Sequence, residues 1–273
     1  MMILVADIGN TNIVLGVFEE DVLLGTLRLP SERKTGSAEY TRCLCALLAE
    51  QGSAPEQLEG AILSSVVPEL TQALAAALQK VTGKPPILVG PQFDHGLAIR
   101  NYDPQQLGSD RIVDGVAALA KYPPPLAIFD LGTASTLSVL DADGAFIGGM
   151  IMVGLRLGTE SLAAHAAQLL PVVLAEPQAL LGTDTVSCIQ SGAIYAAAAM
   201  LDGITERVET ELGQPVTMVV TGGLSGLVVP HCRHALHCEE NLLLVGLQQL
   251  FRRTCCAADP AQKAGASAAE KKG

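Results

Sequence analysis

The chain has 273 residues, which is enough for one large domain or two modest ones. Hydrophobic residues make up 49% and aromatic residues only 3%, which excludes a disordered chain and indicates a core of leucine, valine, isoleucine and alanine. With 17 basic and 28 acidic residues the net charge is −11 and no basic block is present, which argues against a nucleic-acid partner.

The apolar runs are too short for a membrane span, which needs about 20 residues. Asp7 also interrupts the first apolar run too early for a signal peptide. The seven cysteines are not spaced like a disulfide framework, so we expect reduced thiols. These observations predict a cytoplasmic protein without a membrane partner.

In the first part of the chain, apolar runs alternate with turn residues. The Gly9–Asn12 turn connects the first two predicted strands, and Pro68 opens a predicted helix. Strands are predicted over residues 3–6, 13–18, 22–29, 60–67 and 87–89, and helices over residues 37–50, 68–81 and 108–120.

The second part begins after Pro123–Pro125 and repeats the opening pattern. In both parts an apolar strand ends at an aspartate, Asp7 or Asp130, and a glycine turn leads into the next strand. We therefore predict an α/β fold with two similar halves, residues 1–122 and 123–256, followed by a disordered tail over 257–273. Further strands are predicted over residues 126–129, 136–140, 145–152 and 216–220, and helices over residues 157–169, 185–212 and 240–252.

The turn Asp7–Asn12 has the chemistry of a phosphate site. A carboxylate at a strand end can hold Mg²⁺, Gly9 allows close approach of the backbone, and the neutral side chains that follow can donate hydrogen bonds. The alternative is an ordinary polar hairpin. The Asp7–Asn12 pattern recurs at Asp130–Thr136, and this recurrence favours the phosphate site, because two such loops facing each other across a cleft would hold a polyphosphate. Thr221–Gly223 would be a third loop, suited to a nucleoside.

Gly108–Arg111 is a second candidate site, at the start of a predicted helix. Asp110 can accept a proton, and Arg111 can donate two hydrogen bonds to a carboxylate or hydroxyl oxygen. The alternative is a helix cap with a local ion pair. The five histidines and cysteines between residues 231 and 238 match no common zinc spacing, so we predict no zinc site there.

Together these motifs resemble the type III pantothenate kinases, which belong to the superfamily of actin, sugar kinases and heat-shock ATPases. The resemblance runs from Met2 to about Phe251. It rests on Asp7–Asn12, Gly108–Arg111, Asp130–Thr136, Gly148-Gly149, Thr185 with Gln190-Ser191-Gly192, and Thr221–Gly223. It implies two duplicated actin-like (ribonuclease H-like) halves with a nucleotide cleft between them. It also implies a homodimer that uses ATP with Mg²⁺ and a monovalent cation, K⁺ or NH₄⁺, to convert pantothenate to 4'-phosphopantothenate, the first step of coenzyme A synthesis.

The resemblance implies a role for each matching residue. Asp110 would be the general base, and Asp130 would bind the monovalent cation. The residues that would contact ATP are Asp7, Ile8, Gly9, Asn10, Thr11, Asn12, Ile13, Val14 and Thr133. The residues that would contact pantothenate are Tyr102, Gly108, Ser109, Asp110, Arg111 and Thr185.

Three features depart from the family pattern. The segment Gly154–Leu169 carries Arg156 and His165 where more neutral residues are expected. Val153 stands where the family usually has proline, and Tyr102 lies six rather than seven residues before Gly108. Two alternatives therefore stay open. One is a kinase of the same superfamily with another hydroxyl acceptor. The other is a non-catalytic relative that binds nucleotide or pantothenate and acts through protein contacts.

Overall fold

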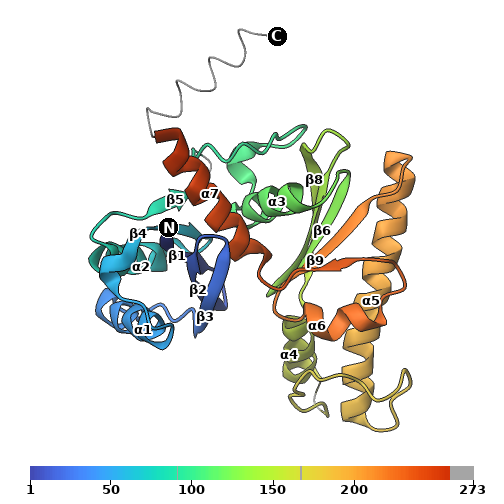
Figure 1. The fold of residues 1–273 in the computed structure, drawn as a ribbon. Coiled ribbons are helices and arrows are strands. Elements are labelled where there is room, and N and C mark those ends of the chain that lie inside the picture. Colours follow the sequence, from blue (N-terminus) through green and yellow to red (C-terminus); the bar gives the residue numbers. More distant parts are fainter. Residues whose placement is uncertain (91, 167, 259–273) are drawn as a thin grey trace, which may run out of the picture. The chain divides into compact units, whose positions relative to one another are not determined.

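The computed structural model describes residues 1–90, 92–166 and 168–258. Its strands form two five-stranded sheets with helices packed against them (Figure 1), so the predicted α/β class is confirmed. The strand order is β3-β2-β1-β4-β5 in the first sheet and β10-β9-β6-β7-β8 in the second. Among the helices of these ranges, none combines the length and apolar composition that a membrane span requires.

The first sheet has β1 in its centre, antiparallel to β2 and parallel to β4. Its strands are β1 (Met2–Ile8), β2 (Asn12–Glu19), β3 (Val22–Pro30), β4 (Leu58–Ser65) and β5 (Ile87–Val89). On one face, alternate residues such as Leu4 and Ile8 form a core with Tyr40 and Leu44 of α1 (Ser37–Glu50) and with α2 (Pro68–Thr82). The short helices η1 (Pro55–Gln57) and η2 (Pro104–Gln106) lie in connections.

The opposite face of the first sheet carries the C-terminal helix α7 (Leu242–Ala258). Glycines make room for it, because a Cβ at Gly60 would lie only 3.0 Å from the ring of Phe251. The buried Gln248 donates to the backbone carbonyl of Glu20 at 2.8 Å and to Asp21 Oδ1 at 3.0 Å. Residues from the two ends of the sequence therefore build one packed layer.

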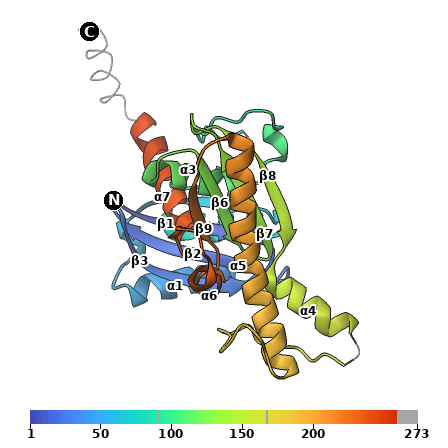
Figure 2. The same cartoon turned by 90° about the vertical axis from the view of Figure 1, so that its right-hand side faces the viewer.

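The second sheet repeats the order of the first, with β6 in the place of β1 and β9 in the place of β4. Its strands are β6 (Leu126–Leu131), β7 (Ala134–Leu140), β8 (Phe146–Val153), β9 (Thr217–Thr221) and β10 (His237–Cys238). The helices of this part are α4 (Leu155–His165), α5 (Thr185–Leu212), α6 (Ser225–Val228) and η3 (Val229–His231), whereas α3 (Ser109–Lys121) is divided between the two compact units of the chain. Ile194 and Leu201 of α5 form a core with Phe129 and Leu137 of the sheet, and Figure 2 shows α5 along it. The predicted duplication is confirmed.

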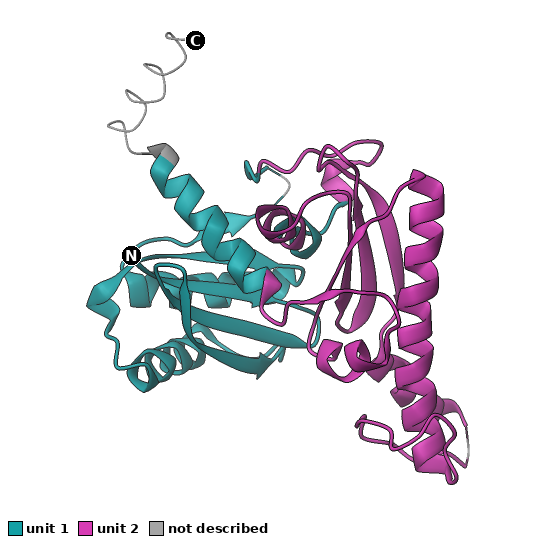
Figure 3. Ribbon diagram, turned by 45° about the vertical axis from the view of Figure 1, so that its right-hand side comes forward, with its two compact units in different colours: residues 1–95, 107–113, 243–273 teal, residues 96–106, 114–242 magenta. Residues whose placement is uncertain are grey.

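The chain forms two compact units that interleave along the sequence (Figure 3). The first contains Met1–His95, Leu107–Val113 and the chain from Leu243, and the second contains Gly96–Gln106 and Asp114–Leu242. The predicted halves 1–122 and 123–256 follow the two sheets rather than these units, and as domains they stay a prediction. Apart from the end of α7, the predicted tail over 257–273 lies outside the described residues.

Several predicted boundaries are wrong by a few residues. The helix predicted over 157–169 is α4, Leu155–His165, and Ala166 is already extended. Pro171 lies shortly beyond, and a proline cannot continue a helix. The strand predicted over 60–67 ends at Ser65, because Val67 is the N-cap residue of α2 with Pro68 in its first turn. The two-residue strand β10 was not predicted, since it is too short to show a period.

Candidate active site

The loop after β1 is held in a fixed shape by hydrogen bonds from two sides. Within the loop, Gly9 N donates to Asn12 O at 3.0 Å. From the end of β3, Ser31 donates through its hydroxyl to Gly9 O at 2.6 Å and through its backbone to Thr11 O at 2.9 Å. Ser31 is a functional candidate that the sequence analysis missed, because nothing in the sequence marks a residue so distant as a partner of the loop.

Asp7 lies at the carboxyl end of β1, on the face of the sheet opposite to α1 and α2. The parallel register of β1 and β4 places Ser64 beside it, and neighbouring strands are about 4.8 Å apart. Ile8 and Ile13 are completely buried in the core, so only their backbone can reach a ligand. Val14 is half-buried.

The Gly108–Arg111 tetrapeptide is attached to this same edge of the first sheet. Ser109 is buried, its Oγ lies 3.0 Å from Ser64 Oγ, and it donates to Ser65 O at 3.3 Å. The first unit therefore brings the Asp7 loop and the tetrapeptide together, as the resemblance implies for two parts of one site.

The carboxylate of Asp110 bends back over Gly108. Asp110 Oδ1 accepts a hydrogen bond from Arg111 N at 2.8 Å. A Cβ at Gly108 would overlap this same oxygen, so the position of the carboxylate requires glycine there. Asp110 is half-buried, and Arg111 is almost completely buried.

In the second unit, the carboxylate of Asp130 lies between two glycines. Thr221 of β9 is its neighbour in the parallel register. A Cβ at Gly222 would overlap Asp130 Oδ1 and lie 2.6 Å from Leu131 N, and a Cβ at Gly132 would lie 3.4 Å from Asp130 Oδ2. The Asp130 loop and the Thr221–Gly223 loop thus meet, and their oxygen atoms are of the kind that hard cations prefer.

Val153, the departure from the family pattern, does not interrupt the local structure. It pairs with Ala134 as the last residue of β8, and Gly154 follows as the N-cap residue of α4. A Cβ at Gly154 would overlap the Thr133 carbonyl and lie 2.6 Å from Gly132 O. The close contact with the Asp130–Thr133 loop depends on Gly154 and not on a proline before it.

Tyr102 and Thr185 also belong to the second unit. The ring of Tyr102 lies edge-on to that of Phe146, with centroids 5.3 Å apart. The segment before it is paired to the sheet, because Arg100 N donates to Phe146 O at 2.8 Å. Thr185 is the exposed first residue of α5, after Asp184, whose carboxylate accepts from Ser187 N.

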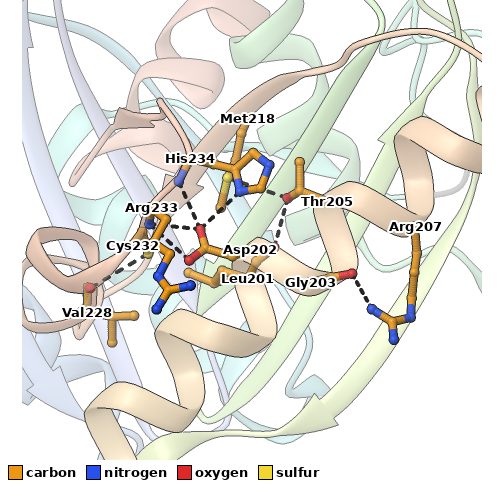
Figure 4. A network of polar contacts seen from close by, with 10 residues as sticks. All are labelled: Leu201, Asp202, Gly203, Thr205, Arg207, Met218, Val228, Cys232, Arg233 and His234. Atoms are coloured by element: carbon orange, nitrogen blue, oxygen red, sulfur yellow. Dashed lines mark hydrogen bonds and ion pairs between the residues drawn. The ribbon is translucent and has the colours of Figure 1, made fainter. Parts of the chain in front are cut away.

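Cys232, Arg233 and His234 follow η3 in a loop that is hydrogen-bonded to one carboxylate (Figure 4). Asp202 of α5 is only 8% exposed and accepts from the backbone N–H groups of Arg233, at 2.9 Å, and His234, at 3.1 Å. His234 Nδ1 lies 3.3 Å from the same carboxylate. Burial raises the pKa of the Cys232 thiol to about 11. Among the described residues, no three histidine, cysteine or acidic side chains are placed to bind one metal ion.

Comparisons of the sequence with known proteins identify one family. Residues 3–207 match the sequence profile of the type III pantothenate kinases. The type III pantothenate kinase of Moorella thermoacetica is 38% identical over 252 residues, covering 92% of this chain and 99% of that protein. The enzyme of the same name from Rhodospirillum centenum is 39% identical over 257 residues, covering 92% and 98%. The ROK hexokinase of Thermus thermophilus has a similar fold, with a TM-score of 0.51 at 16% identity, covering 92% and 97%.

We expect Gly108→Ala to lower kinase turnover by about 100-fold, because the added methyl group must displace the Asp110 carboxylate and small displacements of reacting groups are that costly. Steady-state kinetics measure this. Gly36→Ala is the matched control, since no atom lies within 4 Å of the position that its added methyl group would take. Equal turnover in both variants would contradict a role for the Gly108 contact.

We expect Asp202→Asn to lower the free energy of unfolding at pH 7 by about 2 kcal/mol, because it weakens hydrogen bonds to a charged acceptor. Burial alone would raise the pKa of Asp202, but the N–H groups of His234 and Arg233 outweigh it and hold the pKa below its usual value. The stabilisation is therefore complete above about pH 4 and is lost as the pH falls through the lowered native pKa.

Thermal unfolding at pH 7 and at pH 3 to 4 measures this effect. The Tm difference between wild type and Asp202→Asn should shrink in acid. Asp143→Asn, at an exposed ion pair with Arg100, should leave Tm nearly unchanged at every pH. A Tm difference for Asp202→Asn that is constant over this range would contradict the assignment.

Proposed function

This chain belongs to the type III pantothenate kinase family, and on that premise we propose how its residues carry out the ATP-dependent phosphorylation of pantothenate. The observation that supports this proposal is a pair of contacts at the carboxyl ends of β1 and β4 in the first sheet. Ser64 joins the strand of Asp7 to the helix of Asp110, and Gly108 leaves room for the Asp110 carboxylate.

Asp110 acts as the general base. The primary hydroxyl oxygen of pantothenate attacks the γ-phosphorus of ATP in line with the leaving ADP, and the hydroxyl proton passes to the Asp110 carboxylate. In such a reaction the protein mainly positions groups and neutralises charge, so a carboxylate that is fixed in place matters more than a strongly basic one. Gly108, Ser109, Arg111, Tyr102 and Thr185 line the pantothenate site.

The loop Asp7–Val14 and Thr133 bind the phosphates of ATP. Asn10 and Thr11 are exposed, and the bonds from Ser31 leave the loop little freedom. The Asp7 carboxylate suits Mg²⁺, which binds through one or two carboxylates and the phosphates of the nucleotide. Bound Mg²⁺ supplies neutralisation of phosphate charge.

Asp130 holds the monovalent cation, K⁺ or NH₄⁺. The tight contact of its carboxylate with Gly222 and Gly132 supports this role, because no side chain of these two residues blocks the approach of a cation to the carboxylate. A bound cation there supplies positive charge beside the loop that contains Thr133.

The chain acts as a homodimer in the cytoplasm. The seven cysteines are free thiols, in keeping with a reducing compartment. The second unit exposes large apolar side chains on β8, on α4, in the segment between α4 and α5, and at the start of α5, and extended apolar surfaces mark protein interfaces. They are Met150, Ile151, Val153, Leu157, Leu162, Leu170, Val173, Leu180, Leu181 and Val186. We call them the apolar surface, and the exposed Thr185 precedes one of its members.

We expect ADP release that requires ATP, Mg²⁺ and pantothenate, and that is faster with K⁺ than with Na⁺ alone. A coupled assay measures it. Asp110→Asn should lower kcat by at least about 100-fold, as expected for the loss of a general base, while far-ultraviolet circular dichroism stays unchanged. Near-normal turnover in that variant would exclude Asp110 as the base.

The other arms of this assay separate the alternatives. Turnover with other hydroxyl acceptors but not with pantothenate would indicate a different acceptor. A folded chain that binds ATP without turnover would indicate a regulatory relative. Turnover that is indifferent to K⁺ would exclude the cation role of Asp130 alone.

We expect Ile151→Asp to convert the homodimer to a monomer, because a charge in an apolar interface must be desolvated without a partner. Sedimentation velocity measures the mass in solution. Leu88→Asp, at an equally apolar and 52% exposed position of β5, should leave the dimer intact. A wild-type monomer, or a dimer that survives Ile151→Asp, would contradict this interface.

A further inference from the structure

Ser64, which lies between the strand of Asp7 and the helix of Asp110, is completely buried at the end of β4, and no catalytic effect has yet been assigned to its hydroxyl. Its Oγ lies 3.0 Å from the Oγ of Ser109, which is 8% exposed. A buried hydroxyl pair is stable only while each oxygen finds its partner, because an unsatisfied polar group without water is costly.

The direction of this hydrogen bond follows from the other contact of Ser109. Ser109 donates its single hydroxyl hydrogen to the carbonyl of Ser65 at 3.3 Å. A serine hydroxyl has one hydrogen and two lone pairs, so whenever Ser109 donates to Ser65 O, the bond between the two hydroxyls is donated by Ser64. The two bonds in sequence join β4 to the first turn of α3.

Each of the two serines is next to a carboxylate of the proposed site. Ser64 is paired in register with Asp7, on the same face of the sheet. Ser109 directly precedes Asp110, whose carboxylate bends back over Gly108. A displacement of the first turn of α3 would therefore move Asp110 relative to Asp7.

We propose that Ser64 is a positioning residue for phosphoryl transfer: its hydroxyl fixes the first turn of α3 against β4 and so holds Asp110 in place relative to the Asp7 loop. This inference rests on the function proposed above. It assigns to Ser64 an effect on the rate of transfer and not on the binding of ATP, because its buried side chain cannot contact the nucleotide.

The second sheet supplies a natural substitute for Ser64. Thr221 occupies the equivalent position, beside Asp130 in the parallel register of β6 and β9, and is 4% exposed. The duplicated fold therefore accommodates threonine next to the aspartate in one of its halves. Ser64→Thr keeps the donor and is the conservative variant.

The test compares Ser64→Ala, Ser109→Ala, the double variant and Ser64→Thr with the wild-type full chain. Thr82→Ala is the matched control. Thr82 also has a buried hydroxyl in the first unit, and this hydroxyl donates to Leu78 O at 2.9 Å. Thr82 is the last residue of α2, however, whereas Ser64 precedes the first residue of that helix. For each variant, kcat and the KM values for ATP and pantothenate are measured together with Tm.

We expect Ser64→Ala to lower kcat by about tenfold, the loss of one hydrogen bond expressed as a rate. The KM for ATP should stay unchanged, and Ser64→Thr should retain kcat within about threefold. The double variant should be no slower than the slower single variant, because both substitutions break the same bond. If Ser64→Ala does not fold, Ser64→Cys gives the same comparison, because a thiol of similar size is only a weak hydrogen-bond donor.

Three results would overturn the proposal: wild-type kcat in Ser64→Ala, additive losses in the double variant, or an equal loss of kcat in Thr82→Ala. Wild-type turnover with pantothenate is measured first. Its absence would contradict the proposed function, whereas an active wild type with an unaffected Ser64→Ala would contradict only the positioning role.

Discussion

The candidate site depends on close contact between carboxylates and backbone that carries no side chain. Asp110 bends over Gly108, and Asp130 is enclosed by Gly132 and Gly222, where a Cβ would overlap or crowd the carboxylate. Gly222 has a φ of +96°, which side chains rarely adopt, so both space and backbone conformation demand glycine there. The carboxylates can therefore take these positions only where the neighbouring residues are glycines.

In both sheets, an aspartate near the end of the central strand lies beside a hydroxyl residue of the parallel neighbouring strand, but the two hydroxyl residues contact different segments. Asp7 and Asp130 end the central strands, and a hydroxyl residue, Ser64 or Thr221, stands beside each of them. Ser64 bonds to Ser109 and so reaches the first turn of α3, whereas Thr221 leads directly into the glycine loop. The same layout thus leads to the first turn of α3 in one half and to a glycine loop in the other.

The elements with a clear period were predictable from the sequence, and so was the repeat. The helix over 185–212 was predicted to the residue, because Asp184 is an N-cap and Gly213 a left-handed C-cap. The interleaving of the units was not predictable, since α7 and the Leu107–Val113 segment join the first unit only through tertiary contacts. Ser31 and Ser64 were missed for the same reason: their importance lies in partners far away in the sequence.

The docking of α7 on the first sheet has a consequence for synthesis on the ribosome. At 5–20 residues per second, roughly 7–30 s pass between the emergence of residue 95 and that of Leu243. During that time the face of the sheet with Gly16 and Gly60, which Leu244 and Phe251 later cover, has no helix on it. The nascent first unit therefore presents an apolar sheet face to chaperones until α7 has been synthesised, and its folding ends with the docking of that helix.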